Sequence, residues 1–284
     1  MALRRSTLIG VACGLLLAST AGPTLAGDPA PLHVERPLTA AEQAASDRKV
    51  AAAEAFVTGA RALGKDLSSL ACVPNGQTAT IAPGCGVPQG TIAVEARDQL
   101  FGHYCGPAVA QVISNYAWAV ASGKNAFTQG EIARWMGTDR VGLTDVFSLE
   151  AGLETGTRGS PRRPANWDWL VSILQDTDGD GTLADQLHDY ARFNVSRWRM
   201  PMAVSVKPHA VTSNFNLPSW PRPVHSVGHW IAIYGWYALF SGNDTARLYY
   251  TDSSRDEGGA TGKFWIATRH MAALVGEHHR RIVW

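Results

Sequence analysis

The chain has 284 residues, of which 45% are hydrophobic and 17% charged, and its formal net charge at pH 7 is +1. No basic stripe and no charged tail occurs along it, which argues against a nucleic-acid-binding protein. About 190 residues follow position 93, enough for one sizeable domain.

Residues 1–26 have the pattern of a secretory signal peptide. Arg4 and Arg5 supply the positive start, residues 8–17 the apolar stretch, and residues 24–26 a cleavage site with small residues. The apolar stretch is too short to span a membrane comfortably, and no later segment is a better candidate. We therefore expect an exported protein without a membrane span.

Residues 27–93 form a separate N-terminal region in this interpretation. A Pro-rich, disordered start precedes Thr39 and Glu42, whose spacing is that of a capping box opening an Ala-rich helix to about Leu63. This helix either packs on the following domain or belongs to an inhibitory prosegment. Residues 72–90 are rich in Gly and Pro and predict a loop.

Three cysteines remain after removal of the signal peptide. A disulfide between Cys72 and Cys85 would close a small loop in this region and leave Cys105 unpaired, although other pairings stay open. An odd cysteine in an exported protein is either reactive or bonded to another chain.

Cys105 immediately precedes a segment with the period of a buried helix. Pro107 falls in the first turn, where a missing N–H costs nothing. The positive end of the helix dipole would then lie at the sulfur and favour the nucleophilic thiolate, whereas the alternative is a buried, inert cysteine. The apolar face consists of Val109, Val112, Ile113, Tyr116, Ala117 and Val120.

The rest of the chain predicts an α+β domain over residues 94–284. Thr128 is a plausible N-cap for a short helix to Met136, residues 137–164 are rich in loop signals, and a further helix is expected over 167–175. Strands are expected at 201–206, 229–240, 246–252 and 263–267. Helices followed by strands favour an antiparallel sheet over a doubly wound one.

His229 and Asp252 are candidates for a catalytic base and the group that orients it. They lie on two strands joined by the hairpin tip at residues 241–244. If His229 lies directly opposite Asp252, the centre of the hairpin falls within two residues of that tip. This register would place both side chains on the same face of the sheet. A carboxylate at this place would fix the imidazole tautomer and stabilise the imidazolium. His225 is the alternative base if the register differs.

In combination these segments resemble the papain-like cysteine peptidases, and more narrowly the C39-like peptidases of exported bacterial proteins. The similarity covers about residues 94–274 and rests on Gln99, the Tyr-Cys-Gly-Pro-Ala run, Gly-His-Trp and the later Asp. It implies a papain-like fold with Cys105 as nucleophile, His229 as base, Asp252 as orienting group and Gln99 as oxyanion donor. The activity implied is hydrolysis of peptide bonds.

The same resemblance leaves two other functions open. One is a cell-wall peptide amidase or transpeptidase using the same residues, and the other is a binding or adhesion module that keeps the fold without turnover. We expect a monomer that acts on a peptide or protein, with cell-wall peptide as one source, and no cofactor. Asp176, Asp178 and Asp180 resemble the start of a calcium-binding loop, but Leu187 stands where the bidentate Glu belongs, which favours a solvated loop.

Overall fold

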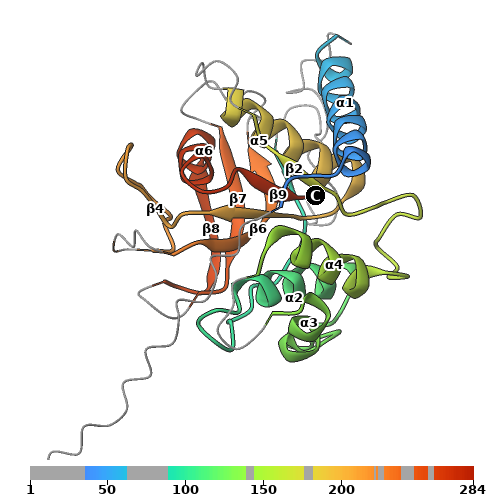
Figure 1. The fold of residues 1–284 in the computed structure, drawn as a ribbon, viewed down its shortest axis with the longest axis vertical. Coiled ribbons are helices and arrows are strands. Elements are labelled where there is room, and N and C mark those ends of the chain that lie inside the picture. Colours follow the sequence, from blue (N-terminus) through green and yellow to red (C-terminus); the bar gives the residue numbers. More distant parts are fainter. Residues whose placement is uncertain are drawn as a thin grey trace, which may run out of the picture. The chain divides into compact units, whose positions relative to one another are not determined.

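An antiparallel β-sheet flanked by helices makes up the computed structural model of this protein. The structure describes residues 36–62, 89–138, 144–175, 182–220, 222, 227–237, 246–254 and 259–284. Within them it contains six α-helices and a seven-stranded sheet, and residues 33–284 form one compact unit. The α+β class expected from the order of helices and strands is confirmed (Figure 1).

The central strand of the sheet, β6, carries His229 at its first position. In spatial order the strands are β2 (Val171–Ile173), β9 (Arg281–Val283), β3 (Met202–Val206), β6 (His229–Tyr237), β7 (Arg247–Asp252) and β8 (Gly262–Ala267). The short strand β1 (Gln89–Thr91) pairs with the far end of β6, beyond the part that pairs with β3. A separate two-stranded ribbon joins β4 (His209–Ala210) to β5 (Phe215–Asn216). Every pairing in both sheets is antiparallel in the part of the chain that is described.

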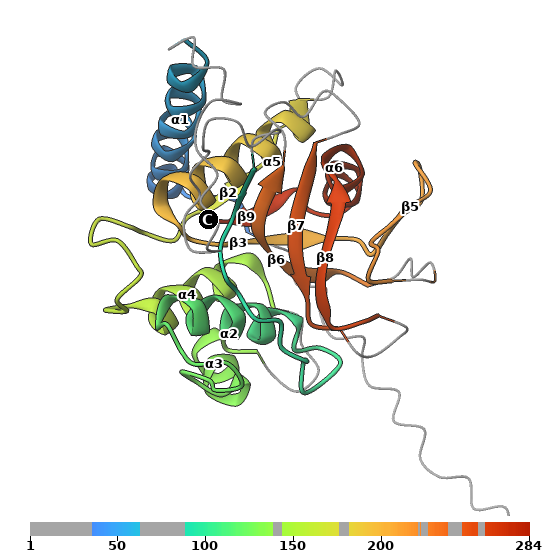
Figure 2. The same ribbon diagram turned by 180° about the vertical axis from the view of Figure 1, so that it is seen from behind.

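The helices form two groups. In both views α2 (Cys105–Ala117), α3 (Gln129–Met136) and α4 (Val146–Thr157) lie together below, and α1 (Ala40–Ala62), α5 (Thr182–Arg192) and α6 (Thr268–Gly276) lie above (Figures 1 and 2). Helix α2 packs on β6 and on both α3 and α4, whereas α5 packs on α6 and a π-helical turn, Phe193–Trp198, follows it directly. None of the helices in the described ranges has both the length and the apolar character that crossing a membrane requires.

Helix α2 is buried along its whole length. All of its residues, including the polar Gln111, Ser114 and Asn115, are buried, because neighbouring helices and strand β6 surround it. Two of these polar side chains are hydrogen-bonded locally, since Gln111 donates to the Phe127 carbonyl and Asn115 donates to Asn125, whereas the Ser114 hydroxyl has no hydrogen-bond partner among the described residues. A helix enclosed on all sides is a rigid support, so the position of Cys105 at its first residue is set by the core.

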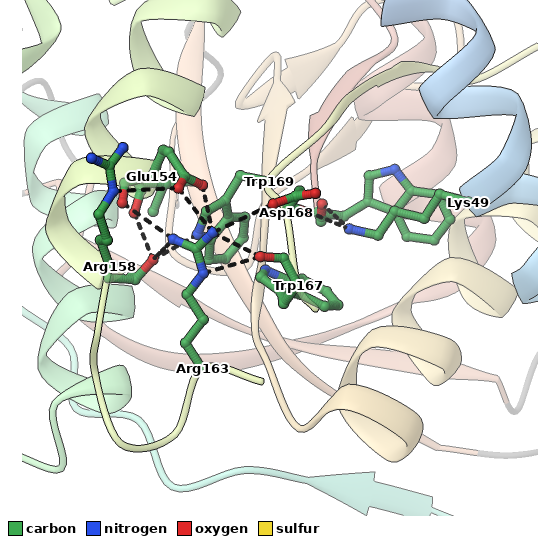
Figure 3. A network of polar contacts seen from close by, with 10 residues as sticks. Lys49, Glu154, Arg158, Arg163, Trp167, Asp168 and Trp169 are labelled. Carbon is green, nitrogen blue, oxygen red and sulfur yellow. Dashed lines mark hydrogen bonds and ion pairs between the residues drawn. The ribbon is translucent and has the colours of Figure 1, made fainter. Parts of the chain in front are cut away.

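Lys49 anchors α1 to the domain. Its side-chain Nζ donates to the main-chain oxygens of Asp168 and Trp284 and lies 3.7 Å from the centre of the Trp167 ring. Figure 3 shows this contact beside a second network, in which Arg163 binds Glu154 at 2.7 Å and the Trp167 carbonyl at 2.7 Å. The capping box predicted at the start of α1 is present, since the Thr39 N–H donates to Glu42 and the Glu42 N–H donates to Thr39.

Two predictions between residues 137 and 175 are wrong. The expected loop contains α4, whose Gly152 and Gly156 lower its intrinsic helix propensity. A Cβ at either glycine would overlap Met136 or Ser114, so these glycines allow α4 to pack closely on its neighbours. The helix expected over 167–175 is instead an extended segment that includes β2, because Leu170 exchanges two main-chain hydrogen bonds with Trp284. A short apolar segment fits both the helical and the strand period, and only its pairing partner in the fold decides which of the two structures forms.

Candidate active site

The first turn of α2 presents Cys105 with uncapped main-chain N–H groups. Tyr104 occupies the N-cap position, and its side chain makes no hydrogen bond to the first turn. The N–H groups at the beginning of a helix have no intrahelical partner, so those of Cys105 and Gly106 remain available to a ligand. A Cβ on Gly106 would lie 2.5 Å from the Thr144 side chain, which shows how closely residue 144 packs behind the nucleophile. Cys105 itself is 6% exposed and not in a disulfide.

His229 begins strand β6 and Asp252 ends strand β7, at the same edge of the sheet. Both side chains are buried, and the imidazole Nε2 lies 2.8 Å from Asp252 Oδ1. The Cys105 side chain lies within hydrogen-bonding reach of the same imidazole. Because Nε2 is used by Asp252, Nδ1 is the ring nitrogen left for the sulfur. Three of the four predicted catalytic residues are therefore brought together, in the order Cys105, His229, Asp252.

The carboxylate of Asp252 accepts four hydrogen bonds. Oδ1 accepts from His229 and, at 2.8 Å, from the main-chain N–H of Ser254. Oδ2 accepts from the Ser219 hydroxyl at 2.6 Å and from the Trp220 indole N–H at 3.0 Å. The Trp220 ring also packs edge-on against the imidazole, with ring centres 5.3 Å apart. This arrangement satisfies a buried negative charge and holds the imidazole in one orientation.

The pKa values of this pair move in opposite directions. Burial by itself lowers the pKa of His229, but the charge of Asp252, its hydrogen bond and the neighbouring Cys105 outweigh burial and raise the pKa to about 10. For Asp252 burial by itself raises the pKa, but the charge of His229 and the hydrogen bonds donated to the carboxylate outweigh burial and bring the pKa below its ordinary value. At neutral pH the site therefore holds an imidazolium beside a carboxylate, and the imidazolium stabilises negative charge on the nearby sulfur.

The predicted register of the hairpin is wrong by two residues. Ala232 lies opposite Thr251, so the register continues with Ile231, and not His229, opposite Asp252. His229 and Ile231 share a face of β6, and diagonal neighbours on one face of a sheet can still reach each other. A β-bulge between Ile233 and Gly235 shifts the register further along the hairpin. The two side chains meet as expected, but diagonally.

Gln99 lies next to the end of β7. Its main-chain N–H donates to the Ser253 carbonyl at 2.9 Å, and its side-chain Nε2 donates to the Gly102 carbonyl at 2.9 Å. Its Oε1 is buried and has no hydrogen-bond partner among the described residues. The amide thus stands in the loop that leads to Cys105, with one N–H of its Nε2 engaged by the Gly102 carbonyl.

Three residues that support the site were not predicted: Ser219, Trp220 and Ser254 all bind Asp252. Ser254 follows Asp252 at i+2, the spacing of an Asx turn, and could have been found from that local pattern. No spacing relates Ser219 and Trp220 to Asp252, and their local signal is the Pro-rich stretch around Trp220, which predicts an irregular loop where an indole N–H needs a partner from elsewhere.

Several predicted features lie outside the described residues: His225, the Cys72–Cys85 pair, the signal peptide and the Asp176–Asp180 loop. In the ranges that are described, no group of three or more His, Cys, Asp or Glu side chains is arranged to hold a metal ion. No protein-family model matches the chain, and comparison with curated proteins also finds no match.

Proposed function

We propose that this protein is a papain-like, C39-like cysteine peptidase that hydrolyses peptide bonds. The observation that carries the proposal is the chain of contacts from Cys105 through His229 to Asp252, with the sulfur at the start of a buried helix. An inert structural cysteine needs neither an imidazole within reach nor a carboxylate that orients it.

The reaction follows from the position of each group. The Cys105 thiolate attacks the carbonyl carbon of the substrate, and the resulting oxyanion accepts hydrogen bonds from the Cys105 main-chain N–H and the Gln99 amide. The imidazolium of His229 then donates its proton to the departing amine, so that the C–N bond breaks and a thioester remains. Water, deprotonated by the now neutral His229, attacks the thioester and releases the acid and the thiolate. Asp252 keeps the imidazole aligned through both steps.

The remaining parts of the proposal concern location and partner. Residues 1–26 would direct export, so the enzyme would act outside the cytoplasm as a monomer on a peptide or protein substrate. Helix α1 packs on α5, on β2 and on the π-helical turn. This contact favours a role as a packing element for α1 over that of a prosegment inserted at Cys105.

Covalent labelling tests the proposal directly. The exported protein, without reduction, would be treated with iodoacetamide or with E-64, and adducts would be located by intact-mass and peptide mass spectrometry. One adduct at Cys105 is expected, together with cleavage of a peptide library by the wild type and no cleavage by Cys105→Ala.

Histidine variants supply the matched comparison. His229→Ala should lose rapid labelling of Cys105, whereas His270→Ala should keep it, because His270 stacks on Phe215 on another part of the domain. An unlabelled Cys105 in the folded wild type, or equal labelling in both variants, would rule out an activated thiol.

A further inference from the structure

A groove with an excess of positive charge lies at the far end of α2 from Cys105. It consists of two adjoining cavities, with volumes of about 410 and 350 Å³, which share Ala93, Tyr116 and Arg162. Arg197 and Arg199, in and just after the π-helical turn, line the first cavity, and Arg97 and Lys263 line the second. Cavities of this size accommodate small ligands or a few residues of a peptide.

The charge of this groove is largely uncompensated. Its lining includes one acidic residue, Glu95, which Arg97 binds at 2.9 Å and which therefore cancels only that arginine. Among the residues that the structure describes, no ion pair involves Arg162, Arg197 or Arg199. The whole chain has a net charge of only +1, so this group of cations is a local concentration and not a property of the entire surface.

The arginines are held in place by aromatic and main-chain groups. Arg162 donates to the Tyr116 carbonyl at 3.0 Å and lies 4.8 Å from the centre of the Tyr116 ring, and Arg197 lies 5.2 Å from that of Trp198. Arg199 hydrogen-bonds to the Tyr116 hydroxyl. Each contact uses part of a guanidinium and leaves other N–H donors for a ligand.

The backbone conformation of Arg199 contributes to the position of this residue in the groove. Its φ is +56°, in the left-handed region that costs a residue with a side chain free energy. It closes the π-helical turn, and its N–H donates to the Asn194 carbonyl. This ending fixes the direction in which the chain leaves the turn and holds Arg199 at the wall of the first cavity.

The groove is connected to the active site in two ways. Helix α2 runs from Cys105 to Tyr116, a rise of about 16 Å. The segment that lines the second cavity at Ala93, Val94, Glu95 and Arg97 continues directly to Gln99. Because α2 is enclosed, this rise is the shortest possible separation, and a peptide extended by about 3.3 Å per residue needs at least about five residues to reach from nucleophile to groove.

We propose that this groove binds an acidic stretch of the peptide substrate, separated by at least about five residues from the bond that is cleaved. This inference rests on the proposed peptidase activity and names the class of substrate. Arginine forks bind carboxylates in a bidentate fashion, and the excess of cations favours a segment with two or more Asp or Glu side chains. The binding energy would add to that gained at the active site and increase kcat/KM for such substrates.

Binding can be measured apart from catalysis. In a Cys105→Ala background, fluorescence anisotropy would compare a labelled peptide containing an Asp/Glu cluster with the same peptide carrying Asn and Gln instead. Arg162→Gln and Arg197→Gln should each weaken binding of the acidic peptide about tenfold, the loss expected for one charge-assisted contact, and leave the neutral peptide unaffected. Arg134→Gln, at an exposed position of α3 outside the groove, should leave both affinities unchanged. Circular dichroism would show that each variant is folded.

The outcomes separate the groove from the catalytic proposal. Unchanged affinity in both groove variants, no preference for the acidic peptide, or equal binding of inorganic polyphosphate would overturn the assignment to an acidic peptide. Turnover of acidic and neutral peptides at the same kcat/KM would also refute it while leaving the peptidase intact. Preferential binding that depends on Arg162 and Arg197, without cleavage by the wild type, would instead overturn the peptidase and keep the groove.

Discussion

Replacement of Asp252 by Asn tests whether the buried carboxylate supports the site as the structure indicates. Each carboxylate oxygen accepts two hydrogen bonds, Oδ1 from His229 and Ser254 and Oδ2 from Ser219 and Trp220. An amide has the same shape but only one acceptor oxygen, so its NH₂ group must face two donors whichever way it turns. The Ser219 hydroxyl can rotate, but the N–H groups of Trp220 and Ser254 cannot.

The magnitude follows from these contacts. At least one fixed N–H loses its acceptor, which costs about 1–3 kcal/mol, and the charge-assisted bond to His229 is worth about 1.5–3 kcal/mol. Since the pair is buried, we expect Asp252→Asn to lower the free energy of unfolding by about 3–5 kcal/mol at pH 7. Asp47→Asn is the control, because Asp47 is exposed on α1, and it should change stability by less than about 0.5 kcal/mol.

The pH dependence gives a sharper criterion. The lowered pKa of Asp252 means that its contribution is present above the ordinary pKa of Asp and is lost as pH falls through the lowered value. The raised pKa of His229 means that its contribution is lost as pH rises toward about 10. Urea unfolding at several pH values should therefore show the largest difference between wild type and variant between the ordinary pKa values of Asp and His, about pH 4 to 6.5, and the difference should shrink on both sides.

The rate of Cys105 alkylation supplies a second readout. Without the carboxylate the pKa of His229 should fall, so the alkylation rate of the variant should depend on pH differently from that of the wild type. A variant with wild-type stability and a wild-type alkylation profile would refute the argument that Asp252 holds the imidazolium in place.

Two further substitutions probe the packing behind the site and the anchor of α1. Gly106→Ala should destabilise the protein by about 1–3 kcal/mol and slow Cys105 alkylation, since the new Cβ would lie 2.5 Å from Thr144. Gly59→Ala is the control and should neither destabilise the protein nor slow alkylation, because nothing lies within 4 Å of its new Cβ. Equal unfolding midpoints for the two alanine variants would contradict this packing. Burial lowers the pKa of Lys49, so the stability of the wild type relative to Lys49→Met should increase with pH between the lowered pKa and the ordinary pKa of lysine, by at most about 1.4 kcal/mol per pH unit. The comparison with a variant cancels the opposite contribution of His229, which is common to both proteins. In urea titrations the exposed Lys124→Met should differ from the wild type by a constant amount, and a constant difference for both variants would exclude a buried, weakly basic lysine.

Local patterns in the sequence were sufficient to predict the elements whose residues agree at short range. The helix beginning at Cys105 combines a first-turn Pro with a regular apolar face, and the helix after Thr128 has the predicted N-cap, which the structure extends to a capping box with Glu131. Strand β6 and its partner β7 are marked by β-branched and aromatic residues on either side of a hairpin tip. These signals depend on neighbours within a few residues, so they can be interpreted without knowledge of the fold.

Contacts between distant segments decided the rest. Helix α4 exists because Gly152 and Gly156 let it approach Met136 and Ser114, and β2 is a strand because residues near Leu170 pair with the last strand of the sheet. Neither partner can be identified from local periodicity.

The candidate site also has one part that the sequence identified and another that depends on the tertiary structure. The identities of Cys105, His229 and Asp252 follow from motifs in the sequence, and the structure brings them together. The diagonal register, the donors from Ser219 and Trp220, and the basic groove at the end of α2 all arise from segments more than ten residues apart in the chain. A sequence specifies which side chains are present, but the free energy of a buried charge depends on the donors that the fold places around it, and so only the tertiary structure decides it.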